Sequence, residues 1–240
     1  MKRRDFLVGG AGLGFFLLSG KALGRAGAAP ARPAGGRLTP PEKGPIRVAF
    51  PISEGVTVID FAGPWEVFQD VMIPDRGGSH EEQMPFAPYT VSASREVVEG
   101  SAGLKIVPDH TFDSAPEARV VVVPAQRGSA ELHAWLRKVA PKADLVASVC
   151  TGAFQLAKAG LLAGQRATTH HDFVDELARR FPDVRVEKGL RFVENERVST
   201  AGGLTSGIDL ALHVVERYFG RAAAERTAAY MEYQSKGWVV

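Results

Sequence analysis

The stretch Asp144-Leu-Val-Ala-Ser-Val-Cys-Thr-Gly-Ala-Phe-Gln-Leu-Ala-Lys-Ala-Gly160 decides how this chain folds. Its first half is an apolar run typical of a buried strand, and its second half has the composition of a helix. Thr151 and Gly152 lie between the two halves. The stretch therefore predicts a strand, a tight turn and a helix, with Cys150, the one cysteine of the chain, on the turn.

The position of Cys150 favours a nucleophile. A helix N-terminus carries partial positive charge and free N–H groups, and both stabilise a thiolate. A sharp strand-to-helix turn also holds the side chain out of the sheet. We therefore expect Cys150 to be a reactive thiol with a lowered pKa. The alternative is a small buried hydrophobic residue, which is the commonest fate of a free cysteine.

Strands and helices alternate along the rest of the chain. The patterns predict strands at 46–50, 89–93, 119–123 and 144–149, a hairpin-like segment at 184–199, and helices at 63–71, 130–139, 153–160, 173–181, 206–219 and 221–233. Pro64 is expected in a first helical turn, where its missing N–H does no harm. This order predicts an α/β fold, a three-layer sandwich with a mostly parallel sheet between helices and reactive groups at the carboxyl ends of its strands.

Residues 1–28 resemble a twin-arginine export signal. The paired Arg3-Arg4 precede a weakly apolar, glycine-rich run, and a small-x-small site follows at 26–28. The run is too short, and too often interrupted by glycine, to form a transmembrane helix. We therefore expect export to the periplasm or another extracytoplasmic space and no stable membrane insertion after cleavage; a retained anchor is the alternative. A lone cysteine in such a compartment can form no internal disulfide.

The signal also accounts for the charge of the chain. Residues 1–28 hold five basic residues and one acidic residue, a net charge of +4, so the total of +2 leaves −2 for the remainder. A basic face is the usual footprint of nucleic-acid binding, so we expect no nucleic-acid partner. Residues 29–45 contain five prolines and predict an extended linker. Residues 46–240 suit one domain with a full core.

Three segments together resemble the ThiJ/PfpI superfamily, which shares the class I glutamine amidotransferase-like, flavodoxin-type fold. They are Val58-Ile-Asp-Phe-Ala-Gly-Pro-Trp-Glu-Val-Phe68, Ser148-Val-Cys-Thr-Gly152 with Gly160-Leu-Leu-Ala-Gly-Gln-Arg-Ala-Thr-Thr-His170, and Ala201-Gly-Gly-Leu-Thr-Ser-Gly-Ile-Asp-Leu-Ala-Leu212. The chain is most similar to the isonitrile hydratase branch. The resemblance implies a flavodoxin-like sandwich with a cysteine nucleophile elbow, a small-molecule substrate, no cofactor and a homodimer.

The resemblance also implies catalytic roles. Cys150 would be the nucleophile. Asp60, after the first strand, would face it and exchange a proton, since burial and like charge keep a carboxyl group near a thiolate partly protonated; the alternative is a helix N-cap. Thr151 would offer its N–H to developing negative charge. His170 would orient water or stabilise the thiolate; a structural histidine is the alternative. His170 and His171 form no metal motif in the sequence.

Two features depart from the family pattern. The peptidase-like branch of the superfamily that this chain resembles has a histidine directly after the cysteine. Thr151 occupies that position in this chain, which disfavours protease activity. The family often has a Gly-Gly pair after the third strand, whereas this chain has Pro124-Ala-Gln-Arg-Gly128, in which Arg127 or Gln126 could alter substrate choice. We expect Gly152, Ala125 and Gln126 to line a substrate or oxyanion site whose shape differs from that of the family.

We therefore expect a cofactor-independent cysteine enzyme that hydrates or hydrolyses a small electrophile, most like an isonitrile hydratase that forms an N-substituted formamide. One alternative is glyoxalase III or deglycase-like chemistry on reactive aldehydes. Another is a non-catalytic sensor, because the domain also resembles the ligand domain of AraC-type regulators. Those regulators continue into a helix-turn-helix region. We expect none here, because the sequence stops at Val240 directly after the last predicted helix.

Overall fold

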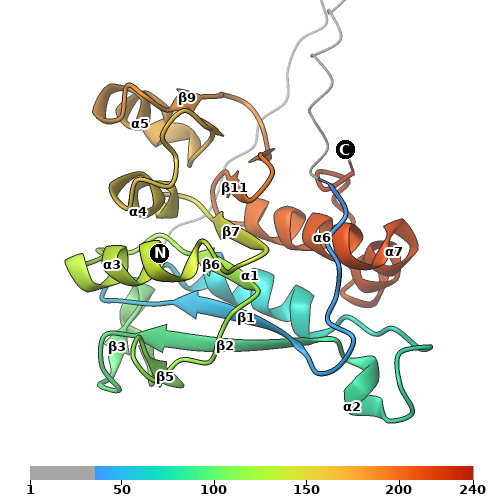
Figure 1. Ribbon diagram of the computed structural model, residues 1–240. Helices are drawn as coiled ribbons and strands as arrows, with labels where there is room; N and C mark the ends of the chain where they lie inside the picture. The colour runs from blue at the N-terminus through green and yellow to red at the C-terminus, as the bar shows by residue number, and fades with distance from the viewer. Residues whose placement is uncertain (1–35, 240) are drawn as a thin grey trace, which may run out of the picture. The chain divides into compact units, whose positions relative to one another are not determined.

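The structure, a computed structural model, describes residues 36–239 (Figure 1). The predicted export signal therefore lies outside the described residues. The larger helices are α1 (Val58–Gln69), α3 (Ala130–Val139), α4 (Gly152–Lys158), α5 (Val174–Arg180), α6 (Ser206–Phe219) and α7 (Arg221–Tyr230). Shorter helical segments are α2 (His80–Gln83), η1 (Ser101–Gly103) and η2 (His171–Phe173). No helix within 36–239 is long and apolar enough to span a bilayer.

Seven strands form one sheet in the order β10-β11-β7-β6-β1-β2-β5. They are β1 (Ile46–Pro51), β2 (Phe86–Ser92), β5 (His110–Thr111), β6 (Val120–Val123), β7 (Leu145–Ser148), β10 (Phe192–Glu194) and β11 (Val198–Ala201). Every pairing is parallel except that of β10 with β11. The predicted α/β fold with a mostly parallel sheet is confirmed.

Each face of the sheet buries its own core, because successive side chains of a strand point to opposite faces. In β1, Val48 and Phe50 pack in one core, and Ala49 packs in the other. The first core also contains buried residues of α1, α6 and α7, and the second those of α3, α4 and α5. Figure 1 shows α3 and α4 on one side of the central strands and α6 and α7 on the other.

The structure differs from the predicted elements in three places. Helix α1 begins at Val58 rather than at 63, so Pro64 lies inside the helix and not in its first turn. The hairpin predicted within 184–199 is present as β10 and β11, but it begins at Phe192. The start of that segment, β9 (Arg185–Val186), pairs in parallel with β8 (Arg166–Ala167). The pair β3 (Val98–Glu99) and β4 (Lys105–Ile106) was not predicted, because two-residue strands leave almost no periodic signal.

The described part of the predicted linker, residues 36–45, lies against the domain without helix or strand of its own. The Leu38 N–H donates to the Arg217 carbonyl at 2.9 Å, and Arg217 Nε donates to the Gly36 carbonyl at 3.0 Å. The Leu38 side chain packs on the first core. This part of the linker is therefore fixed by the domain that follows it.

The turn between β7 and α4 depends on Gly152. A Cβ at this position would lie 2.1 Å from the Val123 carbonyl oxygen, and neither backbone can move without disturbing the sheet. We expect Gly152→Ala to lower the free energy of unfolding by about 1–3 kcal/mol or more, measured by urea denaturation. Gly78→Ala is the matched control, because a Cβ at Gly78 meets no atom within 4 Å. Equal midpoints for the two variants would contradict this packing.

Candidate active site

Cys150 occupies the turn between β7 and α4 with a positive φ of 57°. This left-handed conformation is unfavourable for a residue with a Cβ and is found at nucleophile elbows. The Cys150 N–H donates to the Gly202 carbonyl at 2.8 Å, and the Cys150 carbonyl accepts from Thr169 Oγ1 at 2.8 Å. These two bonds fix the turn to the segment after β11 and to the segment after β8. The residue is only 8% exposed.

Asp60 lies in the first turn of α1, after β1, and is fully buried. Its Oδ2 accepts the Ala125 N–H at 3.1 Å, while Oδ1 accepts no hydrogen bond of ordinary geometry within the described residues. The N-cap interpretation is wrong, because Thr57 occupies that position and Asp60 is inside the helix. The Asp60 carboxyl group instead interacts with the Cys150 thiol.

Burial and mutual repulsion set the proton distribution of this pair. Burial raises the pKa of Asp60 to about 6, although the Ala125 N–H, the Cys150 thiol and the Leu204 N–H each act to lower it. Burial, followed by the negative charge of Asp60, raises the pKa of Cys150 to about 11. At neutral pH the pair is therefore a carboxylate beside a thiol, and Asp60 is placed to act as a base.

The prediction of a low-pKa thiol is wrong, and the hydrogen bonds of the turn explain why. The first N–H groups of α4 are already bonded: Gly152 N–H donates to the Val149 carbonyl at 3.0 Å and Phe154 N–H to the Thr151 carbonyl at 3.0 Å. A helix of seven residues also has a small dipole. The stabilisation of the Cys150 thiolate that remains is smaller than its destabilisation by burial and by the adjacent Asp60 carboxylate.

Two backbone N–H groups still point to the sulfur, those of Thr151 and Leu204, and both lower the pKa of Cys150. The Thr151 contact agrees with the role expected for its N–H. Leu204 was not predicted as a site residue. It follows the Gly202-Gly203 pair that comes directly after β11, and its backbone has a φ of 52° where its N–H contacts both Cys150 and Asp60. The Gly-Gly pair after a buried strand was the signal that could have found it.

The three residues expected at the substrate or oxyanion site use their donors elsewhere. Gly152 bonds Val149, and the Ala125 N–H bonds Asp60. Gln126 Nε2 donates to the Pro51 carbonyl at 2.8 Å, and its buried Oε1 accepts no bond within the described residues. In this geometry Ala125 stabilises the Asp60 carboxylate, and Gln126 presents an acceptor.

His170 lies on the segment that contacts Cys150, but the contact itself is made by Thr169. The His170 ring stacks on His171 at 4.3 Å between centroids and packs against Gly203, and Nδ1 accepts the Asp172 N–H at 3.3 Å. Its role in catalysis stays a prediction. The ligand atoms of His170, His171 and Asp172 lie within 4.8 Å of one another and could hold a divalent ion, although His171 and Asp172 are largely exposed.

A cavity of about 480 Å³ is lined by segments that contact Cys150, although neither Cys150 nor Asp60 is among its lining residues. Its lining includes Thr169, His170 and Leu204, and Arg191 and Lys188 add two cationic side chains. Thr169 and Leu204 also contact Cys150, so the cavity adjoins the pair of acids.

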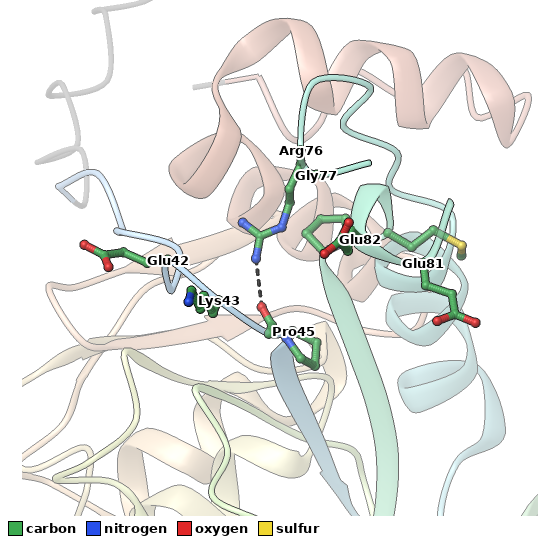
Figure 2. Close-up of a pocket in the computed structure, with 10 residues that line it drawn as sticks. Glu42, Lys43, Pro45, Arg76, Gly77, Glu81 and Glu82 are labelled. Carbon is green, nitrogen blue, oxygen red and sulfur yellow. Dashed lines mark hydrogen bonds between the residues drawn. The ribbon is translucent and has the colours of Figure 1, made fainter. Parts of the chain in front are cut away.

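A second cavity, of about 670 Å³, lies at the opposite edge of the sheet, before β1 and β2 (Figure 2). Figure 2 shows Arg76 directed at the backbone before Pro45, where it donates to the Gly44 carbonyl at 2.8 Å. Glu42, Glu81 and Glu82 also line this cavity. None of its lining residues is a predicted site residue. The candidate active site is therefore assigned to the other end of the strands, where Cys150 lies.

Residues 46–217 match the DJ-1/PfpI family. The chain belongs to this family. It is 31% identical over 197 residues to isonitrile hydratase from Pseudomonas putida, with 78% of each chain covered. It is 29% identical over 200 residues to the transcriptional regulator GbdR from Pseudomonas aeruginosa; the match covers 81% of this chain and 52% of the regulator. A ThiJ/PfpI family protein from Pseudomonas syringae superposes with a TM-score of 0.70 at 29% identity, covering 88% and 84% of the two chains.

The raised pKa of Cys150 predicts how its alkylation depends on pH. Iodoacetamide reacts with the thiolate, so the rate should still be rising above the ordinary cysteine pKa of about 8.5, toward a midpoint near 11. In Asp60→Asn the carboxylate charge is absent, so the midpoint should move down. Asp70→Asn, at the C-cap of the same helix, is the control. A wild-type midpoint at or below the ordinary value would contradict this assignment.

Proposed function

We propose that this DJ-1/PfpI protein is a cofactor-independent cysteine enzyme that adds water to a small electrophile, most like an isonitrile hydratase. One observation carries the proposal: the fully buried Asp60 carboxyl group lies beside the Cys150 thiol. Its pKa of about 6 leaves it ionised at neutral pH, and among residues 36–239 no donor reaches Oδ1 in ordinary hydrogen-bond geometry. The 31% identity to isonitrile hydratase supports the choice of reaction.

In the proposed reaction, sulfur forms a bond to the isonitrile carbon while Asp60 takes the thiol proton. Free transfer from Cys150 to Asp60 is uphill, because the pKa of the thiol is much higher than that of the carboxyl group. The transfer is therefore concerted with attack on the carbon. The proton then passes from Asp60 to the same carbon, and the product of this half-reaction is an S-linked thioimidate.

Water completes the reaction. Asp60 accepts one proton from the water as the water oxygen bonds the thioimidate carbon, and it passes this proton to the nitrogen. The C–S bond then breaks while the hydroxyl group on the same carbon becomes the carbonyl group. The hydroxyl proton passes through Asp60 to the leaving sulfur, so that one isonitrile and one water give one N-substituted formamide and the free thiol. The Thr151 and Leu204 N–H groups stabilise the charge on sulfur when the C–S bond forms and when it breaks.

A sensor function is the second candidate, because the match to the regulator GbdR covers most of this chain. In a sensor, the cavity beside Leu204 would bind a small molecule without turnover. The two functions differ in what they require of Asp60 and Cys150. A binding cavity tolerates loss of the Asp60 charge, whereas the hydratase does not.

The test follows formamide formation from an alkyl isonitrile, with methylglyoxal consumption assayed in parallel. We expect Cys150→Ser and Asp60→Asn each to lose about 10²-fold or more of isonitrile turnover, because nucleophile and base act in the same step. Asp70→Asn, at the end of α1, is the control and should keep wild-type turnover.

Melting temperature separates lost chemistry from lost fold. A folded-state pKa raised from 3.8 to about 6 means that the native state loses stability as pH rises through this range. Asp60→Asn removes that loss, so at pH 7 it should melt no lower than wild type. Turnover of methylglyoxal alone would favour aldehyde chemistry. Turnover of neither substrate, with a ligand bound equally by wild type and Asp60→Asn, would replace the hydratase by the sensor.

We also propose export by the twin-arginine route, on the basis of Arg3-Arg4 in a segment outside the described residues. The double variant Arg3→Lys, Arg4→Lys should accumulate in the cytoplasmic fraction at full length, while wild type is recovered from the periplasm after cleavage near residue 28. Lys21→Arg is the matched control, because it alters a basic residue outside the pair. Equal periplasmic recovery of the double variant and wild type would overturn this route.

A further inference from the structure

The Leu204 N–H stabilises both members of the acid pair, so the loop that carries it must be held in place. Leu204 has a positive φ of 52°, and its side chain is 44% exposed. Packing of its own side chain therefore cannot fix the N–H. Contacts made by the neighbouring residues of the loop have to supply the restraint.

Arg191 holds this loop at two points. Its backbone carbonyl accepts the Gly202 N–H at 2.9 Å, and its Nη2 donates to Thr205 Oγ1 at 3.2 Å. These bonds lie on the two sides of Leu204. Arg191 thus bridges the loop, with its backbone on the Gly202 side and its guanidinium group on the Thr205 side. The second contact requires that the guanidinium group be oriented.

Asp209 orients Arg191. The Asp209 carboxylate is fully buried in the first turn of α6, and Oδ2 accepts from Arg191 Nε at 2.5 Å and also from Nη2. Planar two-point contact of this kind fixes the direction of a guanidinium group, as lysine could not. The other oxygen, Oδ1, accepts from Tyr233 Oη at 3.2 Å and from Ser235 Oγ at 3.0 Å.

The segment after α7 completes the cluster. Trp238 is 1% exposed, its indole N–H donates to the Ser235 carbonyl at 3.0 Å, and Arg221 lies over its ring. A Cβ at Gly237 would lie 2.6 Å from Asp209 Oδ2, so the backbone passes directly against the carboxylate. Asp209 is therefore clamped on both oxygens by segments far apart in the sequence.

We propose that Asp209 is a positioning residue of the active site: through Arg191 and Thr205 it sets the direction of the Leu204 N–H and thereby the reactivity of Cys150. The proposal deepens the proposed function and rests on it for its catalytic meaning. The physical claim concerns the thiol alone. Thiol reactivity can therefore test it whether or not an isonitrile is the substrate.

The experiment compares Asp209→Asn and Thr205→Val with wild type. Asp209→Asn keeps the shape of the side chain but removes the charge that orients Arg191. Thr205→Val removes one exposed hydroxyl that makes no cap bond to α6, so its fold should be retained even if Asp209→Asn fails to fold. The first control is Thr205→Ser, which keeps the hydroxyl. The second is Lys188→Ala, which removes a cationic side chain that lines the same cavity and is paired with the exposed Asp175.

The measured quantities are the Cys150 alkylation rate across the alkaline pH range and the melting temperature. Losing the Leu204 N–H raises the pKa of Cys150, so the midpoint should move up and the rate below it should fall by about threefold or more, which corresponds to about half a pH unit. Thr205→Ser and Lys188→Ala should follow the wild-type profile. A wild-type profile in both Thr205→Val and folded Asp209→Asn, whatever their melting temperatures, would reduce the cluster to a structural role and overturn the proposal.

If wild type converts no isonitrile but the alkylation midpoints shift as stated, the proposed reaction fails and the positioning role survives. If wild type converts isonitrile and the midpoints do not shift, the reverse holds. When both hold, Asp209→Asn should lower kcat with little change in KM, because the N–H acts on charge that develops on sulfur during the reaction.

Discussion

The burial of the Asp60 carboxyl group against the Cys150 thiol is the interaction on which the site depends. Two acidic groups in a site that excludes water cannot both ionise. The carboxyl group remains much the stronger acid, so the negative charge lies on oxygen and the proton on sulfur. A single buried charge requires N–H donors, and Ala125 and Leu204 supply them. The protonation state of each group thus depends on the other.

The sheet brings these groups together because its central strands are parallel. Asp60 follows β1, Ala125 follows β6, Cys150 follows β7 and Leu204 follows β11, and these strands are neighbours in the order β11-β7-β6-β1. Parallel strands end at the same edge, so four segments spread over about 145 residues of sequence meet there. Gly152 allows the turn after β7 to lie against β6, since no side chain fits beside the Val123 carbonyl.

The sequence predicted the features that depend on local pattern. The strand before Cys150, the turn and the following helix were readable, as was α6, because each has a strong period or a distinctive break. The pKa of Cys150 was not, since it is set by burial and by an acid 90 positions away. Nor was Leu204, whose contribution is a backbone N–H directed by an unusual φ. Asp60 could be placed near the thiol only through the family resemblance.

The energetic state of Asp60 bears on the choice between enzyme and sensor. Raising its pKa from 3.8 to about 6 means that ionised Asp60 costs about 3 kcal/mol of stability at neutral pH. A cavity that only binds a ligand gains nothing from that cost, because a neutral residue in the same place would give a more stable protein. A base must be ionised, desolvated and beside its acid in order to act. The desolvation cost of ionised Asp60 therefore favours the proposed hydratase over the sensor, because simple recognition does not need an ionised, buried base.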